Sequence, residues 1–274
     1  MIAAGRALLA ATLLLAGCSA TPDAAAAAPL PPVAGAFDYQ LGGAYDLPGA
    51  AVVVRDATAD SPAGAYGVCY VNGFQTQPGA GADWLAHRPS AVLRDAAGVP
   101  VTDPDWPDEY VLDPSTAARR TVILDALRPV ITGCADRGFD AVEIDNLDTF
   151  TRFTDAESGL VDRAGALDLA RSFVALAHDS GLAIGQKNAA ESAALGRHDL
   201  GFDFAVAEEC AAFDECAAYA DAYGPHVLQV EYADTLPRPF AEVCASADRA
   251  PLTILRDRAL LPAGAEGHVY AQCP

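Results

Sequence analysis

The sequence is poor in basic residues. Its 274 residues include 17 Lys and Arg against 37 Asp and Glu, so the formal net charge is −20. A protein that binds nucleic acid needs a concentrated basic face for the phosphates, and no such face is visible here. We therefore expect no nucleic-acid partner. An acidic surface suits a cationic substrate, but it serves solubility equally well.

Patterns that bind metals are also missing. The sequence has no Cys-x-x-Cys pair, and its five His residues are scattered. Zinc sites in proteins usually show closely spaced Cys pairs or clustered His residues. We expect neither a metal site nor a cofactor.

No apolar run near the start is long enough to span a bilayer permanently. A short positive segment, Met1 to Arg6, precedes an apolar run from Ala7 to Ala16, which is typical of a signal peptide. The run ends in Leu15-Ala16-Gly17-Cys18, which resembles a bacterial lipobox with Cys18 as the lipidated residue. The alternative is a plain signal peptide that happens to contain a cysteine.

These features divide the chain into three parts. We expect a lipoprotein signal peptide at 1–18, a flexible tether rich in Ala and Pro at 19–35, and one folded domain at 36–274. Such a protein lies outside the cytoplasm and is lipid-anchored to a bacterial membrane. With 52% apolar residues and 23 Gly, the composition favours a single well-packed domain.

Six cysteines remain when Cys18 is set aside, an even number in an oxidising compartment. Up to three disulfides are therefore possible. Cys210 and Cys216 lie in one short segment and are the favoured pair. The sequence does not pair the other four.

Eight short β-rich runs recur along the domain, most of them separated by helical patterns. They are Phe37 to Leu41, Ala51 to Arg55, Val68 to Val71, Ala141 to Ile144, Ala183 to Gln186, Phe204 to Ala207, Val227 to Val230 and Leu252 to Leu255. Alternating strands and helices at regular spacing predict a (β/α)8 barrel of the TIM type. No good helix follows the eighth strand, so we expect an irregular closure.

The helix before the fifth strand is the clearest. Leu169, Phe173, Leu176 and Ala177 form its apolar stripe. A second helix, with Ile123 and Ile131 on its stripe, precedes the fourth strand and contains Pro129. The two helices are followed by Gly181 and Gly138, where a glycine often ends a helix.

In such a barrel the active site lies at the carboxyl ends of the strands. The residues that follow the eight runs are polar: Gln40, Asp56, Asn72, Asp145 with Asn146, Lys187 with Asn188, Glu208 with Glu209, Glu231, and Arg256 with Asp257. Carboxylates that meet in one mouth can cleave glycosidic bonds, because one protonates the leaving oxygen and another acts as nucleophile or base.

Aromatic residues gather around the third run and the long segment that follows it. Trp84 and Trp106, the only tryptophans, lie in this segment with Phe74 and Tyr110, and Tyr70 lies in the run itself. Rings such as Tyr70 and Trp106 are suited to stacking on a sugar. For each ring taken separately, packing of the loop against the barrel is the simpler interpretation.

Several strings, in order along the chain, resemble glycoside hydrolase family 114. They are Phe37-Asp38-Tyr39-Gln40-Leu41, Val68-Cys69-Tyr70-Val71-Asn72, Trp106-Pro107-Asp108-Glu109, Val142-Glu143-Ile144-Asp145-Asn146-Leu147-Asp148, Gly185-Gln186-Lys187-Asn188, Ala207-Glu208-Glu209-Cys210 with Glu215-Cys216, and Val230-Glu231-Tyr232. The resemblance covers residues 37 to about 232. It departs from the family pattern at Phe37, Ile144 and Ala207, and Ala207 adjoins a proposed catalytic residue, which leaves fine specificity open.

The family comprises endo-α-1,4-polygalactosaminidases and their relatives. The resemblance implies Asp145 and Glu208 as the two catalytic carboxylates, and we assign Asp145 as nucleophile and Glu208 as acid/base in a retaining mechanism. The alternative is a salt-bridging pair at the barrel rim. Glu143 is expected to form a buried ion pair with Lys187.

Other polar residues at the strand ends are candidates for contacts with sugar hydroxyl or ammonium groups. Together with Tyr70, Trp106 and Lys187, the expected substrate-binding residues are Asp56, Asn72, Asp148, Asn188 and Glu231. For each of these last five, loop capping is an equally good interpretation.

Three functions remain open. The first is an endo-acting hydrolase of α-1,4-linked galactosamine polymer, a cationic polysaccharide that fits an acidic cleft. The second is a non-catalytic carbohydrate-binding lipoprotein on the same barrel. The third is a barrel lyase or aldolase in which Lys187 forms a Schiff base.

Overall fold

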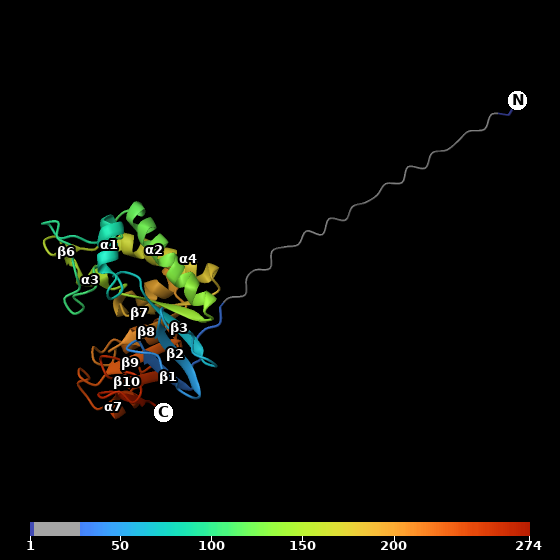
Figure 1. Cartoon of the computed structure of the whole chain (residues 1–274). Helices are drawn as coiled ribbons and strands as arrows, with labels where there is room; N and C mark the ends of the chain where they lie inside the picture. Colours follow the sequence, from blue (N-terminus) through green and yellow to red (C-terminus); the bar gives the residue numbers. More distant parts are fainter. Residues whose placement is uncertain (3–27) are drawn as a thin grey trace.

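Eight parallel strands form the wall of the molecule. The computed structural model describes residues 1–2 and 28–274. The strands are β1 (Ala36–Gln40), β2 (Ala50–Asp56), β3 (Tyr66–Asn72), β4 (Ala141–Asp145), β7 (Ala183–Lys187), β8 (Phe204–Glu208), β9 (Val227–Tyr232) and β10 (Leu252–Arg256). They follow one another around the sheet in chain order, and each pairs in parallel with the next (Figure 1). The predicted barrel is confirmed, with every predicted strand present to within two residues at each end.

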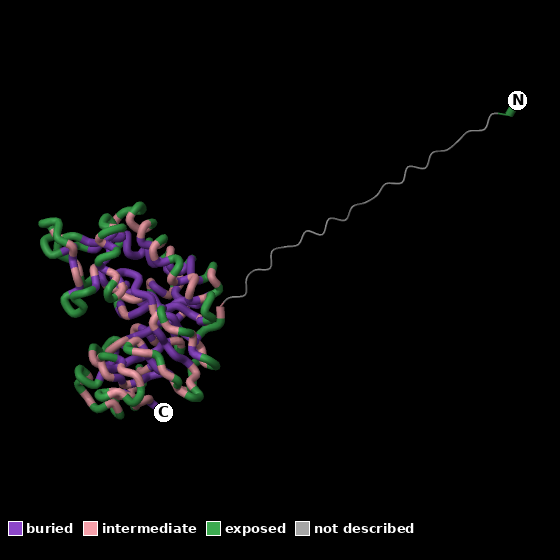
Figure 2. Tube along the Cα trace, in the orientation of Figure 1, coloured by how far each residue is buried: buried purple, intermediate pink, exposed green. Residues whose placement is uncertain are grey.

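The strands are buried on both faces. Because successive side chains of a strand point to opposite sides, one set, which includes Val54, Val68 and Val230, packs in the barrel interior. The other set, which includes Val142 and Ile184, packs against the helices outside. Figure 2 shows the resulting buried core running through the centre of the molecule. Burial on both faces explains why these strands read as continuous apolar runs.

Helices and short strands fill the connections. They are helices α1 (Gly81–His87), α2 (Ala117–Asp136), α3 (Thr149–Arg152), α4 (Arg163–Asp179), α5 (Ala193–Leu195), α6 (Cys216–Tyr223) and α7 (Phe240–Cys244), helical turns at Pro89–Ala91, Ala190–Ser192 and Gly196–Leu200, and strands β5 (Thr154–Asp155), β6 (Gly159–Leu160) and β11 (Tyr270–Gln272). The connections from β1 to β2 and from β2 to β3 contain no helix. The helical layer is therefore incomplete.

The two predicted long helices are α2 and α4. The side chains of Thr116 and Asp162 cap their amino ends by accepting a hydrogen bond from a backbone N–H three residues further on, which satisfies an amide that has no partner within the helix. Gly138 and Gly181 follow them with positive φ angles, a backbone conformation that glycine adopts without strain.

The barrel closes by an irregular seam between β10 and β1. After β10 the chain forms β11, which pairs antiparallel to β10. Side chains span the remaining gap: Gln272 Oε1 accepts a hydrogen bond from the Phe37 N–H at 3.0 Å, and the Tyr270 hydroxyl donates to the Phe37 carbonyl at 2.8 Å. The fully buried Arg256 adds an ion pair to Asp38 of β1. The expected irregular closure is confirmed, although β11 was not predicted.

Residues 28–35 lie against the amino-terminal end of the barrel. The Tyr66 hydroxyl donates to the Pro29 carbonyl at 2.6 Å, and His226 Nδ1 lies 3.2 Å from the Pro31 carbonyl oxygen. The last part of the expected tether therefore contacts the folded domain. Cys18 and residues 19–27 lie outside the described residues. No helix in the described part has the length and apolarity that a bilayer crossing requires.

Three disulfides cross-link the domain. Cys69 is joined to Cys134, Cys210 to Cys216, and Cys244 to Cys273. The pair Cys210 with Cys216 is the one favoured by the sequence. Disulfides of this number are typical of proteins outside the cytoplasm.

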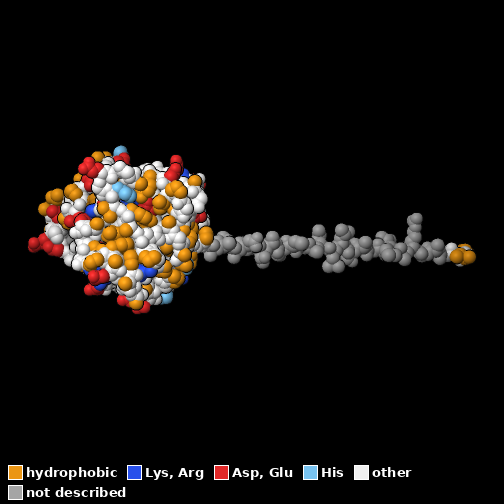
Figure 3. Space-filling view, turned by 90° about the horizontal axis from the view of Figure 1, so that it is seen from below, with side chains coloured by type: hydrophobic (Ala, Val, Ile, Leu, Met, Phe, Trp, Pro, Cys, Tyr) orange, Lys and Arg blue, Asp and Glu red, His pale blue; other side chains and the backbone are white. Residues whose placement is uncertain are grey.

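The charged groups of the surface are dispersed. On the face drawn in Figure 3, acidic side chains stand mostly near the periphery and basic side chains are few and separated. This face therefore offers no concentrated basic patch.

Candidate active site

A single lysine lies at the centre of the barrel mouth and contacts three carboxylates. Lys187, the only lysine in the sequence, ends β7 and points into the barrel. Its Nζ lies 3.1 Å from Glu143 Oε1, 3.4 Å from Asp145 Oδ1 and 3.1 Å from Glu208 Oε2. The three carboxylates thus converge on one ammonium group from strands β4 and β8, which flank β7 in the sheet.

The carboxylates differ in their access to solvent. Glu143 and Lys187 are 0% and 2% exposed, whereas the side chains of Asp145 and Glu208 are 15% and 21% exposed. Glu143 and Asp145 lie two residues apart and point to the same side of β4. The ion pair of Glu143 with Lys187 therefore forms a buried floor, and Asp145 and Glu208 form the upper layer that a ligand can reach.

The environment of Lys187 keeps it charged. Burial alone lowers the pKa of this ammonium group, but attraction by Asp145, Glu208 and Glu143 outweighs it and raises the pKa well above its usual value. The Tyr39 hydroxyl accepts a further hydrogen bond from Nζ at 2.9 Å. A Schiff base requires a neutral, accessible amine, so this environment argues against the covalent-lysine alternative.

Burial also affects Glu143. Loss of solvation, together with repulsion from Asp145 and Glu208, raises the pKa of Glu143 to about 7, although Lys187 and a hydrogen bond from the Tyr39 hydroxyl at 2.8 Å oppose the rise. The predicted buried ion pair is therefore present. Its position below the upper layer suits a structural role.

Asp145 is held by donors on both oxygens. The Tyr70 hydroxyl donates to Oδ2 at 2.6 Å, and the Asn146 backbone N–H donates to Oδ1 at 2.7 Å. Burial, followed by repulsion from Asp145, raises the pKa of Tyr70 well above its usual value. The phenol therefore stays protonated and remains a donor to the carboxylate.

Glu208 has a matching set of partners. The Tyr232 hydroxyl donates to Oε1, and the Asn188 side-chain amide donates to Oε2 at 3.3 Å. The side-chain oxygen Oδ1 of Asn188 accepts a hydrogen bond from the Glu208 backbone N–H at 2.9 Å, so the Asn188 side chain fixes both the backbone and the side chain of Glu208. Arg258 stacks on the Tyr232 ring, with its guanidinium carbon 4.1 Å from the ring centre.

The backbone turns sharply just after these strand ends. Asn146, Asn188 and Glu209 follow Asp145, Lys187 and Glu208, and their φ angles are +67°, +49° and +59°. Asn is among the few residues that adopt this conformation readily, whereas Glu is strained in it. Strained backbone of this kind is concentrated at functional sites.

The predicted substrate-binding residues fall into two groups. Tyr70, Lys187 and Asn188 contact the two carboxylates directly, and the side-chain oxygen Oδ1 of Asn72 accepts a hydrogen bond from the Asn146 side-chain amide at 3.0 Å. The remaining four are Asp56, Trp106, Asp148 and Glu231.

In the described part of the chain, these four form no hydrogen bond or ion pair with Asp145 or Glu208. Asp56 caps a turn by accepting from Thr58. Asp148 pairs with Arg152 at 3.0 Å, and Trp106 is 51% exposed on the loop between β3 and β4. Asp56 therefore makes the local contact that the loop-capping interpretation expects, whereas the Asp148 side chain precedes α3 without capping it.

Glu231 lies on the outer side of the wall. Its neighbour Tyr232 points into the barrel, so Glu231 points outward, where Oε1 accepts hydrogen bonds from the Ala211 N–H at 2.9 Å and from Gln229 at 2.8 Å. The structure does not bring Glu231 to the other site residues. Its position follows from the two-residue alternation of β9.

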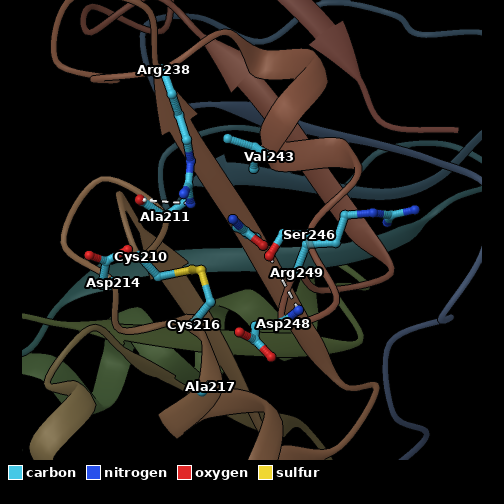
Figure 4. A pocket seen from close by; sticks show the side chains of 11 residues that line it. Cys210, Ala211, Asp214, Cys216, Ala217, Arg238, Val243, Ser246, Asp248 and Arg249 are labelled. Atoms are coloured by element: carbon cyan, nitrogen blue, oxygen red, sulfur yellow. Dashed lines mark hydrogen bonds between the residues drawn. A yellow bond between two sulfur atoms is a disulfide. The ribbon is translucent and has the colours of Figure 1, made fainter.

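A small cavity lies on this outer side as well. It has a volume of about 140 Å³, and the Cys210–Cys216 disulfide, Gln229 and Arg238 are among the residues that line it (Figure 4). Within the described residues, Cys210, Cys216 and Glu231 form the one group with ligand atoms close enough for a metal. The two sulfurs are bonded to each other, so they are not thiolate ligands.

Sequence reasoning missed three residues of the mouth. Tyr39 and Tyr232 supply hydroxyl groups to Glu143 and Glu208, and the alternation within β1 and β9 could have identified them as interior residues. Glu109 is buried beside Asn72. It lies in an irregular loop, where no periodic signal predicts burial.

Comparisons with known proteins bear on the fold and the family. The chain is 21% identical to Ega3 of Aspergillus fumigatus, whose crystal structure is a complex with galactosamine; the match covers 90% of this chain and 98% of that one, with a TM-score of 0.69. It is 17% identical to the glycoside hydrolase domain of PelA from Pseudomonas aeruginosa, over 84% of this chain and 97% of that one, with a TM-score of 0.58. At these identities the likeness shows a shared fold.

No curated protein matches the sequence. The sequence pattern of glycoside-hydrolase family GH114, in contrast, matches residues 19–274. This match covers the whole barrel and every strand end described above. The chain therefore belongs to glycoside hydrolase family GH114.

Proposed function

We propose that this glycosidase is an endo-acting hydrolase of α-1,4-linked galactosamine polymer. Asp145 acts as the nucleophile and Glu208 as the acid/base. The observation that supports this best is the convergence of the two partly exposed carboxylates on Lys187. A pair of carboxyl groups on either side of the scissile bond is what glycoside hydrolysis requires.

The spacing of the pair favours a retaining mechanism. Asp145 Oδ1 and Glu208 Oε2 both lie within 3.4 Å of the same nitrogen, so their separation is less than twice that distance. Retaining enzymes place their carboxyl groups roughly 5–5.5 Å apart, and inverting enzymes roughly 6.5–9.5 Å apart to leave room for a water molecule. The separation of these two oxygens is therefore compatible with the retaining distance, and it excludes all but the shortest inverting distances.

The hydrogen bonds support the division of roles. Asp145 accepts a backbone N–H from Asn146, and this donor cannot turn around to accommodate a protonated carboxyl group. Glu208 Oε2 faces the Lys187 ammonium group and a longer hydrogen bond from the Asn188 amide at 3.3 Å, but among the described residues the only partner of its Oε1 is the Tyr232 hydroxyl, which can donate or accept. The fixed anion suits the nucleophile, and Glu208 is left as the group that carries a proton.

The reaction then proceeds in two balanced steps. Glu208 gives its proton to the glycosidic oxygen as that bond breaks, while Asp145 forms a bond to the anomeric carbon. In the second step, Glu208 takes a proton from a water molecule, whose oxygen attacks the same carbon and releases Asp145. Lys187 stays charged between the two carboxylates throughout.

The substrate follows from charge and from the relatives. The net charge of −20 favours a cationic polymer, and a similar structure, that of Ega3, holds galactosamine. We further propose that Cys18 is lipidated, so that the enzyme acts on polysaccharide outside the cell membrane. The disulfides support an extracytoplasmic location.

Substitution of the two carboxylates tests the mechanism. Asp145→Asn and Glu208→Gln keep the side-chain shape but remove the nucleophile and the proton donor. On partly deacetylated galactosaminogalactan, each should lower kcat by at least about a thousandfold, or about 4 kcal/mol of transition-state stabilisation. Circular dichroism and thermal unfolding should show that both variants remain folded.

Substrates with a good leaving group separate the roles. Such substrates need little protonation, so Glu208→Gln should lose least on them, whereas Asp145→Asn should fail on all. Near-normal activity in both variants would overturn the proposal. Polymer binding without any cleavage by the unsubstituted protein would instead support a carbohydrate-binding function.

A further inference from the structure

Glu109 is a buried carboxylate beside the proposed nucleophile. It lies in the loop between β3 and β4 and is 6% exposed. The Asn72 side-chain amide donates to its Oε2 at 2.7 Å. Asn72 is directly opposite Asp145 in the pairing of β3 with β4, so the carboxylate of Glu109 lies next to the site where the reaction takes place.

Within the described residues, Glu109 is not paired with a cation. The neighbouring carboxylates, in contrast, are paired with cations. Asp145 pairs with Lys187, and both Asp103 and Asp148 pair with Arg152. Its second oxygen, Oε1, accepts no hydrogen bond from the described residues, and it is not among the buried side-chain atoms that lack a partner. This oxygen therefore keeps some contact with solvent.

An unpaired carboxylate in such a place is costly. Burial, followed by repulsion from Asp145, raises the pKa of Glu109 to about 7. The groups that face it are the carboxylates of Asp145, Asp108 and Asp103, with Arg152 beyond Asp103. A cation supplied by a ligand would stabilise the ionised form, because charge-assisted hydrogen bonds are strong in a partly desolvated site.

We propose that Glu109 is the specificity-determining carboxylate that accepts the ammonium group of the galactosamine unit next to Asp145, an inference that rests on the substrate proposed above. The same turn presents Trp106: the Glu109 N–H donates to the Trp106 carbonyl at 2.9 Å. One short turn thus carries both the buried carboxylate and an exposed ring that can stack on a sugar.

The test compares Glu109→Gln with a matched control. Gln keeps the shape of the side chain and an oxygen that can accept from Asn72, but it has no charge. Asp108→Asn removes one negative charge from the adjacent, exposed position on the same turn. Calorimetric titration of each protein with galactosamine and with galactose, which carries a hydroxyl in place of the amine, measures recognition without turnover.

We expect Glu109→Gln to weaken galactosamine binding by about 10- to 100-fold, the usual effect of losing one charged hydrogen bond. Galactose binding should change by less than about twofold, and Asp108→Asn should behave like the unsubstituted protein. Galactosamine affinity of the unsubstituted protein should rise as the pH increases from about 5 to about 7, because Glu109 becomes ionised while the sugar amine is still an ammonium group. This rise should be absent in Glu109→Gln.

Three results would overturn the inference. They are galactosamine binding by Glu109→Gln within about twofold of the unsubstituted protein, an equal loss for galactosamine and galactose, and an equal loss in Asp108→Asn. The first excludes a contact, the second indicates a structural role, and the third indicates a general charge effect. Failure of the unsubstituted protein to cleave the polymer is a separate result, and it would refute the proposed function instead.

Discussion

Replacement of Lys187 by Met tests whether its ammonium group holds the mouth of the barrel together. The substitution keeps a long side chain and removes the cation that lies 3.1–3.4 Å from Glu143, Asp145 and Glu208. Loss of one partner from a buried ion pair costs about 3–5 kcal/mol, because it leaves an uncompensated buried charge. We expect the free energy of unfolding at pH 8 to fall by this amount.

The loss should depend on pH in a defined direction. The pKa of Glu143 is already raised to about 7 in the folded protein, and removal of Lys187 raises it further. A carboxyl group whose pKa is raised on folding lowers stability as the pH rises above its unfolded value. Lys187 itself, whose pKa is also raised, contributes fully at any pH below about 10. The deficit at pH 8 should therefore exceed that at pH 5 by at least about 1 kcal/mol, which corresponds to roughly one pKa unit.

Urea denaturation at pH 5 and pH 8, followed by circular dichroism, measures both quantities. The double variant Lys187→Met with Glu143→Leu removes both charges of the buried floor and should recover at least about half of the loss. Arg171→Met is a suitable control, because Arg171 and its partner Asp168 are each about half exposed, and it should cost less than about 0.5 kcal/mol. A deficit below about 1 kcal/mol, or one that is the same at both pH values, would refute this account.

Two further predictions concern cysteines. Cys18→Ala should move the protein from the membrane fraction to the soluble fraction in cell fractionation, because the acyl chains on Cys18 are its expected anchor; unchanged association would contradict the lipobox interpretation. Replacing both Cys210 and Cys216 by Ser should lower the free energy of unfolding by about 2 kcal/mol, which is the entropy effect expected for so short a loop. The same change should reduce kcat, because the loop directly follows Glu208. Free thiols at these positions in a non-reduced digest of the unsubstituted protein would contradict the pairing.

Much of the fold could be predicted because strands buried on both faces appear in the sequence as short apolar runs. Apolar runs such as Val52-Val53-Val54 are short and are followed by polar residues, so they located all eight strands. The same runs located Asp145, Lys187 and Glu208, since a barrel places its strand ends in one mouth.

Other parts could not be predicted because their positions depend on distant partners. The residue after each apolar run lies at the end of a strand. Whether its side chain points into the barrel or outward depends on the two-residue alternation of that strand. Tyr232 therefore lies in the mouth, and its neighbour Glu231 lies outside. β11 is three residues long and is held to β1 by side chains some 230 positions away in the sequence. Such contacts leave no local pattern.

The side-chain seam also has a consequence for aggregation. Wherever a sheet is not closed by backbone pairing, its edge strands can pair with another chain. Here β11 and the fully buried Arg256 occupy the space between β10 and β1, and the disulfide from Cys244 to Cys273 fastens β11 one residue beyond its end. Residues 270–274 therefore cover two strand edges, and their removal would expose strands that can join one molecule to the next.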